Sequence, residues 1–414
     1  MIDKDLVIIG GGAAGLASAI SAFDNGIKDI LIIERDDHLG GILHQCIHNG
    51  FGLTTFKEEL TGPEYAQRYI DQIKEKQIKY VLNSQVISLK SDKVVTYSNE
   101  EEGVVEVKAK AIILATGSYE RGAGAINLPG SRVAGILTAG TVQKYINLKG
   151  YLVGKRAVIV GSGDIGLIMA RRLTLEGVKV LCVSEIMPYS NGLNRNIVQC
   201  LNDFNIPLKT SMTVTNVIGK KRVEKIVLSK IDENKNPIPG TEEVYDADLL
   251  VLSVGLIPYT TLLDDLNIHY GRSRGAVVND SFETEIPGLF CCGNCLHIHD
   301  LVDYVSLEGN VAGKSAAKYI LGNSENKTSI NVVNGDLVNY VVPNKINIKN
   351  DEDVSLKFRV SKPLKECYIV ISGDNKVIKK IKMPSIVPSI MQNVTISKES
   401  LSNVKEVKVG ILYE

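Results

Sequence analysis

Two stretches of the chain follow the same order of apolar and polar positions. In the first, residues 6–9 are all apolar, a glycine-rich turn follows, and an alanine-rich run extends to about Phe23. A second strand-like run, residues 29–33, ends on Glu34. Continuous apolar strands that alternate with helices are typical of a parallel sheet covered on both faces. The pattern predicts a strand, a tight turn, a helix and a second parallel strand.

The same order returns in the middle of the chain. Residues 157–160 are apolar, a glycine turn and a helical pattern to about Glu176 follow, and the strand-like run 179–184 ends on Glu185. The chain is therefore predicted to hold two βαβ units.

Further runs predict the rest of the two sheets. Residues 61–76 have the spacing of an amphipathic helix. Residues 111–117 and 249–255 are buried-strand patterns that each end on a glycine. We expect the breaker-rich segments 127–130 and 255–258 to be crossings between domains.

The character of the chain changes after about Ile330. Glycine becomes scarce, and residues 354–360 alternate between apolar and polar. Further runs of this kind, separated by turn residues, are 367–371, 376–381, 393–396 and 404–412. We expect a small antiparallel, sandwich-like β domain of about 80 residues, without an obvious catalytic constellation.

Composition narrows the possible partners and location. Lys plus Arg equal Asp plus Glu at 47 each, and tryptophan is absent, which disfavours a nucleic-acid partner. Residues 6–23 carry no charge, but three consecutive glycines disfavour a membrane-spanning helix. The acidic start is a poor signal peptide, and seven irregularly spaced cysteines do not resemble a disulfide framework. We expect a cytoplasmic protein with no integral membrane segment.

Each βαβ unit carries glycines where a dinucleotide pyrophosphate needs them. In Gly-x-Gly-x-x-Gly, the first glycine permits a tight turn, the second lets phosphates approach the backbone, and the third lets helix and strand pack closely. The helix N-terminus adds free N–H groups and partial positive charge. These glycines are Gly10, Gly12 and Gly15 in the first unit and Gly161, Gly163 and Gly166 in the second.

An acidic residue follows each glycine turn at the spacing expected for ribose binding. Glu34 and Glu185 are placed to accept hydrogen bonds from an adenosine ribose. A carboxylate at Glu185 would repel a 2′-phosphate, and the nearest basic residues, Lys179 and Arg195, form no cluster. We therefore expect NAD(H) rather than NADP(H) at the second turn.

These motifs, in this order, resemble the two-dinucleotide flavoprotein superfamily that includes thioredoxin reductase and the pyridine nucleotide-disulfide oxidoreductases. Residues 10–15 with Glu34 resemble its FAD site, and residues 161–166 resemble its NAD site. Residues 114–117 resemble the strand end where the chain leaves the FAD domain, and residues 288–294 resemble the second FAD signature. The resemblance covers about the first 320 residues.

The resemblance implies an α/β fold with two Rossmann-like, three-layer dinucleotide-binding domains, the NAD domain being inserted in a discontinuous FAD domain. The FAD domain would comprise residues 1–120 and 256–328, and the NAD(H) domain residues 121–255. Residues 331–414 would be the C-terminal β domain.

Carried over residue by residue, the resemblance also implies the cofactor contacts. Those to FAD would be made by Gly10, Gly12, Ala13, Ala14, Gly15, Glu34, Arg35, Gly40, Gly41, Val86, Ala115, Thr116, Gly117, Gly293, Asn294, Val302 and Asp303. Those to NAD(H) would be made by Gly161, Gly163, Asp164, Ile165, Gly166, Glu185 and Gly255. The helix that begins near Asp303 would point its N-terminus at the flavin pyrimidine edge and favour the anionic reduced ring.

The chain departs from this superfamily in two places. The second FAD signature usually ends Gly-Asp, whereas Gly293 is followed by Asn294, which can still donate and accept hydrogen bonds. The disulfide reductases carry a cysteine pair after the first βαβ unit or inside the NAD domain, whereas here only Cys46 follows the first unit.

A closer resemblance is to flavoprotein subunits found with opine oxidase, hydrogen cyanide synthase and anaerobic-type glycerol-3-phosphate dehydrogenase systems. It rests on residues 40–52 and on residues 292–294 followed by His297, His299 and residues 300–303. It implies a flavoprotein that works beside a dehydrogenase or iron–sulfur partner subunit. A homo-oligomer is left open.

Four residues are candidates for catalysis near the flavin: His44, Cys46, His48 and His299. By the resemblance, the first three lie across the isoalloxazine face, where His44 or His48 would carry a proton. The equal alternative is that these residues line the flavin or cap a turn.

Two further constellations have weaker support. Cys292 and Cys295 have the CxxC spacing of a redox dithiol, but burial as packing residues is favoured. His297 and His299 with Cys295 and Cys46 do not match a standard zinc pattern, so no metal site is predicted.

The sequence thus predicts an FAD-dependent, NAD(H)-linked oxidoreductase that transfers a hydride between nicotinamide and flavin. Its electrons would pass to a small-molecule or protein acceptor, either directly or within a larger dehydrogenase. Two alternatives remain: a dithiol-disulfide reductase that uses Cys292 and Cys295, and a non-catalytic flavin- and NAD-binding sensor or scaffold.

Overall fold

A computed structural model of the chain describes residues 2–322, 329–348, 352–374 and 376–413. The chain forms two compact units, one of Met1–Ser118 with Pro258–Glu414 and one of Tyr119–Ile257. The second unit is therefore inserted between the two stretches of the first. Residue 328, the predicted end of the FAD domain, lies outside the described residues.

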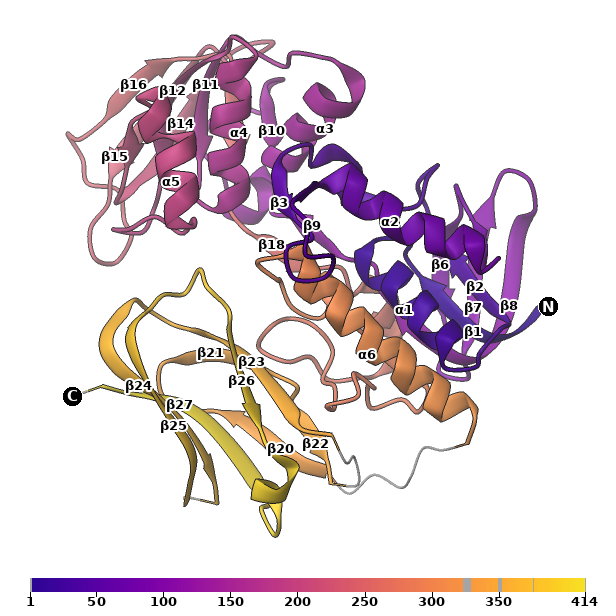
Figure 1. Cartoon of the computed structure of the whole chain (residues 1–414). Coiled ribbons are helices and arrows are strands. Elements are labelled where there is room, and N and C mark those ends of the chain that lie inside the picture. Colours follow the sequence, from indigo (N-terminus) through magenta and orange to yellow (C-terminus); the bar gives the residue numbers. More distant parts are fainter. Residues whose placement is uncertain (1, 323–328, 349–351, 375, 414) are drawn as a thin grey trace. The chain divides into compact units, whose positions relative to one another are not determined.

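A seven-stranded sheet forms the centre of the first unit (Figure 1). Its first strand lies between two parallel neighbours, and Ile8 pairs with Ile32 on one side and Ile113 on the other. All three residues are fully buried, as an interior parallel strand requires. The order is β5 (Lys79–Val81), β2 (Ile30–Ile33), β1 (Ile2–Ile9), β8 (Gly103–Leu114), β7 (Val94–Asn99) and β6 (Gln85–Leu89), with β19 (Leu289–Cys291) also paired to β8.

Two helices of the first unit, α1 (Ala13–Asp24) and α6 (Val302–Ile320), lie side by side (Figure 1). A Cβ atom on Gly309 would lie 2.4 Å from the Ala14 carbonyl oxygen, and one on Gly313 would lie 2.2 Å from the Ser18 carbonyl oxygen. Because a Cβ atom does not fit at these distances, the two glycines set how closely the helices approach.

The helix predicted at residues 61–76 is α2 (Gly62–Glu75). Thr61 and Glu64 form a capping box, in which each side chain accepts a hydrogen bond from the other residue's backbone N–H. The helix N-terminus is thus satisfied by its own sequence.

The second unit contains the other predicted parallel sheet. Its strand order is β10 (Ile136–Thr138), β17 (Leu249–Leu252), β11 (Arg156–Val160), β12 (Lys179–Ser184) and β13 (Leu208–Lys209). A separate antiparallel sheet contains β14 (Met212–Ile218), β15 (Lys225–Lys230) and β16 (Glu243–Asp246). The helices are α3 (Ala139–Lys149), α4 (Asp164–Leu175) and α5 (Asn194–Cys200).

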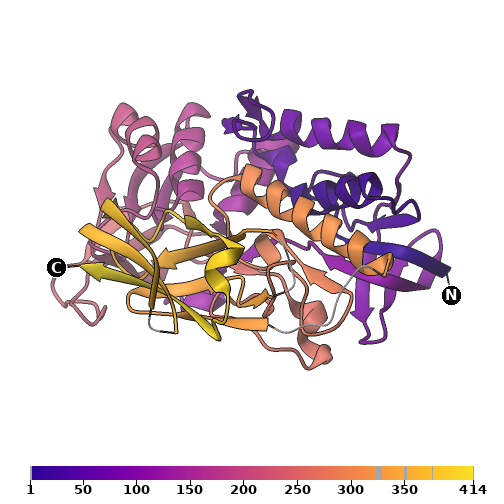
Figure 2. The same ribbon diagram turned by 60° about the horizontal axis from the view of Figure 1, so that its bottom comes forward.

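The C-terminal part of the first unit is a two-sheet β domain, drawn in orange to yellow in Figures 1 and 2. One sheet has the order β22 (Lys345–Asn347), β20 (Ser329–Asn334), β27 (Glu406–Tyr413), β24 (Leu364–Gly373) and β25 (Lys376–Ile386). The other has the order β21 (Val338–Val342), β23 (Val354–Val360) and β26 (Gln392–Ile396). Leu356, Phe358 and Ile371 are fully buried in its core.

One strand pair of this domain differs from the antiparallel prediction. β20 and β27 pair in parallel. These are the first and last strands of the domain, so no hairpin turn joins them and nothing local fixes their relative direction.

Short strands complete the described fold. β3 (Asn49–Phe51) pairs with β4 (Leu60–Thr61) in the first unit. β9 (Ser118–Glu120) and β18 (Leu256–Pro258) lie where the chain passes between the units, close to the expected crossing at 255–258. The other expected crossing, 127–130, lies within the second unit.

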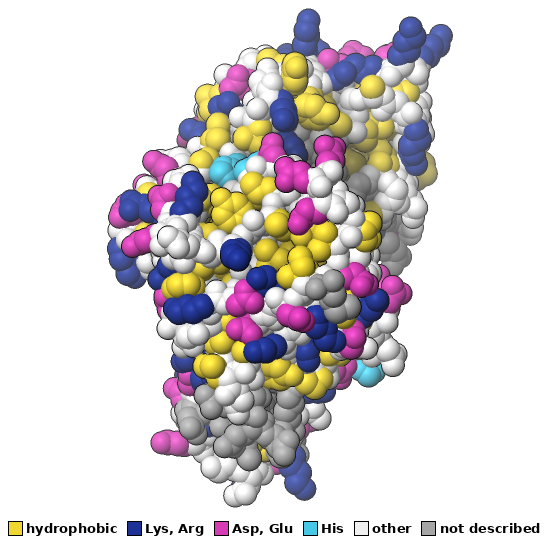
Figure 3. Space-filling view, turned by 90° about the vertical axis from the view of Figure 1, so that its right-hand side faces the viewer, with side chains coloured by type: hydrophobic (Ala, Val, Ile, Leu, Met, Phe, Trp, Pro, Cys, Tyr) yellow, Lys and Arg dark blue, Asp and Glu magenta, His cyan; other side chains and the backbone are white. Residues whose placement is uncertain are grey.

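Surface charge and helix composition bear on the predictions about nucleic-acid and membrane partners. On the face drawn in Figure 3, basic and acidic side chains are interspersed among apolar ones, in line with the balanced composition. In the described part of the chain, no helix has both the length and the apolar character that crossing a bilayer demands. The predicted fold class, α/β with a small C-terminal β domain, is confirmed.

Two candidate dinucleotide sites and a buried charge cluster

The three glycines of the first turn have three different surroundings. Gly10 has φ +105°, and a Cβ atom on it would lie 2.5 Å from the Ala115 carbonyl oxygen. A Cβ atom on Gly15 would lie 1.9 Å from the Gly10 carbonyl oxygen, whereas one on Gly12 would have no neighbour within 4 Å. The first and third glycines are needed by the fold itself, and the second leaves open space where a phosphate group fits.

The N-terminus of α1 faces this open space without a cap of its own. Gly12 is the N-cap residue and supplies no side-chain hydrogen bond, and no acidic residue lies in the first turn. This contrasts with the capping box of α2. The first N–H groups of α1 are thus suited to bind an anion.

Glu34 lies beside the same turn, buried and hydrogen-bonded. Its Oε2 accepts from the Gly11 N–H at 2.6 Å, and its Oε1 accepts from the Asp36 N–H at 2.9 Å. Each carboxylate oxygen can accept further hydrogen bonds, so a ribose hydroxyl can still be bound.

The predicted Gly40–Gly41 pair packs onto the first turn. The Gly40 N–H donates to the Gly11 carbonyl at 2.8 Å, and a Cβ atom on Gly41 would lie 3.3 Å from the Gly12 Cα. Both glycines have positive φ. The structure therefore brings together two glycine segments that lie about 30 residues apart in the sequence.

The second glycine turn repeats this construction in the other unit. Gly161 has φ +96°, and a Cβ atom on it would lie 2.0 Å from the Ser253 carbonyl oxygen. A Cβ atom on Gly166 would lie 2.6 Å from the Gly161 carbonyl oxygen, whereas one on Gly163 would have no neighbour within 4 Å. Gly163 is also the N-cap of α4 and supplies no side-chain cap.

Glu185 occupies the place in the second turn that Glu34 occupies in the first. Its Oε2 accepts from the Ser162 N–H at 2.9 Å and from the Ser162 hydroxyl at 2.6 Å, and its Oε1 accepts from the Met187 N–H at 2.9 Å. In both turns the acidic residue binds the backbone N–H between the first two glycines.

Three other residues that were predicted to contact NAD differ in their surroundings. The Asp164 carboxylate accepts from the Leu193 N–H at 2.8 Å and from the Asn196 side chain at 2.6 Å, so it already orders a neighbouring loop. Ile165 lies half-buried in the first turn of α4. Gly255 has φ +108° and lies just beyond β17.

The remaining candidates from the FAD half lie in several places. Ala13 and Ala14 begin α1. Thr116 donates through its hydroxyl to the Tyr259 carbonyl at 2.6 Å, and the Gly117 carbonyl accepts from the Tyr259 N–H at 2.9 Å. The Arg35 guanidinium lies 5.7 Å from the centre of the Tyr259 ring.

Val86 and the first turn of α6 complete the set. Val86 is buried in β6, two residues after Ser84, whose N–H donates to the Glu34 carbonyl at 2.9 Å. Val302 begins α6, and the carboxylate of the next residue, Asp303, accepts from the N–H groups of Gly52, Thr54 and Thr55 at 3.1, 3.2 and 2.7 Å. That carboxylate fixes the 52–55 loop.

The three catalytic candidates between residues 40 and 52 each contact different neighbours. The His44 ring donates through Nε2 to the Leu39 carbonyl oxygen at 2.6 Å and packs edge-on against His38. His48 packs against Phe51, with ring centres 5.1 Å apart. Burial raises the pKa of the Cys46 thiol to about 12, which disfavours a thiolate nucleophile at this position.

The cysteines near the second FAD signature are fully buried. The Sγ atom of Cys295 lies 3.5 Å from that of Cys291, while Cys292 Sγ lies 3.7 Å from the Ser18 hydroxyl. Burial and neighbouring acidic groups raise the pKa of the Cys292 thiol well above its usual value. The Cys295 thiol thus lies against the Cys291 thiol, and its contact with Cys292 is to the backbone carbonyl at 3.1 Å.

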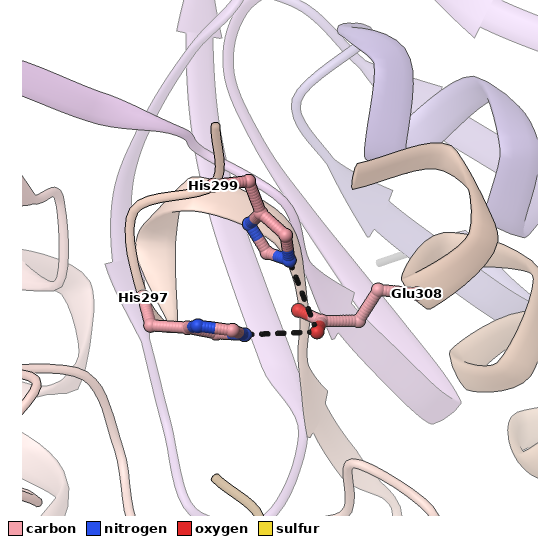
Figure 4. A group of neighbouring side chains, drawn as sticks. All are labelled: His297, His299 and Glu308. Carbon is pink, nitrogen blue, oxygen red and sulfur yellow. Dashed lines mark hydrogen bonds and ion pairs between the residues drawn. The ribbon is translucent and has the colours of Figure 1, made fainter. Parts of the chain in front are cut away.

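His299 belongs to a buried cluster with His297 and Glu308, shown in Figure 4. Both imidazole rings point at the Glu308 carboxylate, with Nε2 to Oε2 distances of 3.0 Å for His297 and 3.2 Å for His299. His299 Nδ1 lies 3.2 Å from Oδ1 of Asn294, the asparagine of the second FAD signature. The cluster therefore adjoins that signature.

The electrostatics of this cluster are dominated by burial. Burial lowers the pKa of His297 to about 4, so its ring is neutral at neutral pH. Burial alone would raise the pKa of the Glu308 carboxyl, but Lys357, His297 and His299 hold it well below its usual value. The cluster thus contains an ionised, fully buried carboxylate.

Sequence reasoning missed three residues that complete these sites. Ser162 lies between two glycines of the second turn, and this position in the motif could have indicated a contact with Glu185. Glu308 lies in α6 directly before Gly309, so a charge on a helix of small residues was visible in the sequence. Lys357 gave no signal, because an alternating strand lysine usually faces water.

The sequence matches the family described as pyridine nucleotide-disulphide oxidoreductase over residues 4–312. It is 26% identical over 335 residues to an NADH oxidase of Streptococcus pneumoniae, covering 74% of this chain and 68% of that protein. It is 24% identical over 342 residues to hydrogen cyanide synthase subunit HcnB of Pseudomonas protegens, covering 76% and 70%.

A solved structure of thioredoxin reductase from T. acidophilum aligns with a TM-score of 0.63 and 25% identity, covering 78% of this chain and 100% of that one. The family match spans both glycine turns and the second FAD signature. Members of this family bind FAD and NAD(P)H, and the two turns have the open middle glycine that a pyrophosphate needs. The predicted superfamily and cofactors are confirmed: this chain belongs to the pyridine nucleotide-disulphide oxidoreductase family.

Proposed function

We propose that this chain passes a hydride from NADH to FAD and then delivers electrons to an acceptor, as the flavoprotein of a larger dehydrogenase. The observation that carries the proposal is the repeated construction of the two glycine turns. In each, the first and third glycines are closed by backbone, the middle glycine is open, and a buried glutamate holds the turn. Two dinucleotides can therefore be bound in the same manner.

Each part of the chain has a proposed task. FAD, when bound, supplies the ring that accepts the hydride. The α1 N-terminus and Glu34 would hold its pyrophosphate and ribose, and the α4 N-terminus and Glu185 would hold those of the nicotinamide cofactor. Asn294 and the first turn of α6 would hold the flavin end, where the helix dipole favours negative charge.

Among the four catalytic candidates, His299 has the most support. It lies beside Asn294 and is linked to a buried carboxylate, so it can hold a proton near the flavin end of the site. Cys46 has less support because its thiol is held neutral.

A partner subunit is favoured over a disulfide substrate as the electron acceptor. The relative named hydrogen cyanide synthase subunit HcnB is by its name one subunit of an assembly. A dithiol mechanism through Cys292 and Cys295 has little support, because the Cys295 thiol lies against the Cys291 thiol and all three thiols are buried.

Cofactor preference tests the assignment of the second turn. Glu185 should favour NADH, because its carboxylate repels a 2′-phosphate. In anaerobic stopped-flow experiments, NADH should reduce the flavin at least about tenfold more efficiently than NADPH, and Glu185→Ala should lose most of this preference. Glu233→Ala, which removes an exposed acid of the same unit, is the control. An unaltered preference in Glu185→Ala would show that the ribose lies elsewhere.

A further inference from the structure

Strand β23 of the C-terminal β domain has two different faces. Its apolar residues alternate with polar ones, and the apolar set fills the core of the domain: Val354, Leu356, Phe358 and Val360. On the opposite face, Lys357 and Arg359 contact the part of the first unit that precedes and begins α6. The polar face of β23, which the alternating pattern predicts to be exposed to solvent, is therefore covered by that part of the first unit.

Lys357 reaches the buried charge cluster. Its Nζ lies 2.6 Å from Glu308 Oε2, and it lies 5.3 Å from the centre of the Phe282 ring. The Glu308 side chain is fully buried and that of Lys357 is 13% exposed. A buried carboxylate of this kind is costly unless a cation and hydrogen-bond donors accompany it.

The other oxygen of the same carboxylate binds the second FAD signature. Glu308 Oε1 accepts from the Gly293 N–H at 2.7 Å. Gly293 has φ +73°, and a Cβ atom on it would lie 2.8 Å from the Ala14 Cβ, so this turn also packs against the start of α1. One carboxylate thus joins Lys357 to the turn at Gly293 and Asn294.

Arg359 holds the next part of the same segment. Its guanidinium donates to the Ile298 carbonyl at 3.0 Å and pairs with the Asp300 carboxylate, which also accepts from the Met391 N–H at 2.7 Å. Residues 293–300 are thereby held from the C-terminal domain at two points.

We propose that the C-terminal β domain completes the flavin site, with Lys357 as a positioning residue that acts through Glu308. The ammonium keeps Glu308 ionised, and the ionised carboxylate holds the Gly293 N–H and orients the turn that carries Asn294. The inference rests on the proposed function, because it takes that turn to bind FAD.

A metal ion is the alternative occupant of the cluster. Ligand atoms of His297, His299 and Glu308 all lie within 4.8 Å of one another. The Lys357 ammonium, however, already contacts the carboxylate oxygen that a metal would share, and it would repel a cation there. The charge network explains the lysine, whereas a metal site does not.

The test compares four full-length variants by their affinity for FAD, measured by quenching of flavin fluorescence on reconstitution. Lys357→Met removes the charge and keeps the stem, and Lys357→Arg keeps the charge. The double variant Lys357→Met/Glu308→Gln removes both charges together. Lys365→Met, an exposed lysine on the neighbouring part of the domain, is the matched control. Visible circular dichroism of the bound flavin reports the orientation of the ring.

The four variants should differ in their affinity for FAD in a specific order. Lys357→Met should bind FAD about tenfold or more weakly than the wild type and with altered visible dichroism, since it strands a buried carboxylate. Lys357→Arg and the double variant should recover most of the loss, and Lys365→Met should match the wild type. If Lys357→Met is insoluble, Glu308→Ala replaces it, because it removes the acceptor of the Gly293 N–H.

Two results would overturn the inference. One is wild-type affinity and dichroism in Lys357→Met, or in Glu308→Ala where that variant replaces it. The other is a stoichiometric divalent metal in the purified wild-type protein, found by elemental analysis. Failure of the wild type itself to bind FAD would instead overturn the proposed function.

Discussion

At the scale of single residues, the glycines were predictable and the buried charges were not. The surroundings of Gly10, Gly12 and Gly15 follow from a local motif, because the turn, the strand and the helix are neighbours in the sequence. The contact between Glu308 and Lys357 joins residues 49 positions apart through two domains. Such a pair depends on tertiary packing, which no local pattern encodes.

The middle glycine of the first turn offers a test of the phosphate site. Gly12→Ala should leave the unfolding midpoint of the apoprotein nearly unchanged, because its Cβ meets open space, but should weaken FAD binding about tenfold or more by filling that space. Gly15→Ala is the contrast, because its Cβ would clash with the Gly10 carbonyl oxygen and destabilise the fold. Unchanged FAD affinity in Gly12→Ala would place the phosphates elsewhere.

The buried cluster predicts a loss of stability in acid. The pKa of His297 is lowered from 6.5 to about 4, so between these values the unfolded chain binds the proton more tightly than the folded protein. Its contribution is full above about pH 6.5 and is lost as the pH falls toward 4, by roughly 3 kcal/mol. The lowered pKa of Glu308 acts in the same direction at lower pH.

Urea unfolding of the full-length protein at several pH values measures this effect. The free energy of unfolding should fall through that range in the wild type and fall less in His297→Phe, which cannot take up the proton. Equal slopes in both proteins would show that His297 does not titrate as described.

At the scale of elements, strands and helices were well predicted where an apolar run or a regular alternation is uninterrupted. Residues 354–360 and 179–184 match β23 and β12 in full. The strand predicted at 111–117 differs at both ends: β8 stops at Leu114 and begins earlier, at Gly103, where its more exposed residues lack a continuous apolar pattern. The close packing of α1 on α6 was partly visible in the small residues of α6.

The packing of those two helices gives a prediction for Gly309. Gly309→Ala should destabilise the first unit by about 1–3 kcal/mol, because its Cβ would lie 2.4 Å from the Ala14 carbonyl oxygen. The displaced α1 should also bind FAD more weakly. Gly124→Ala, at a position with no neighbour within 4 Å, is the control for thermal unfolding. Equal melting temperatures for the two variants would contradict the packing described.

At the scale of the whole molecule, the insertion of one unit into the other was implied by the family resemblance, and the two glycine turns predicted only that two βαβ units exist. The covering of β23 was not, because alternation alone does not say whether the polar face meets water or another domain. The proposed role of the C-terminal β domain depends on the contacts of Lys357 with Glu308 in α6 and of Arg359 with Ile298 before α6, which are tertiary contacts.

The proposed function requires that one chain binds both FAD and a nicotinamide dinucleotide and that a hydride passes between them. Anaerobic titration of the FAD-loaded protein with NADH, followed by the flavin absorbance, tests it most directly. We expect loss of the oxidised flavin band with about one equivalent of NADH, because each hydride carries both electrons that the ring accepts. A flavin band that persists in excess NADH would contradict it.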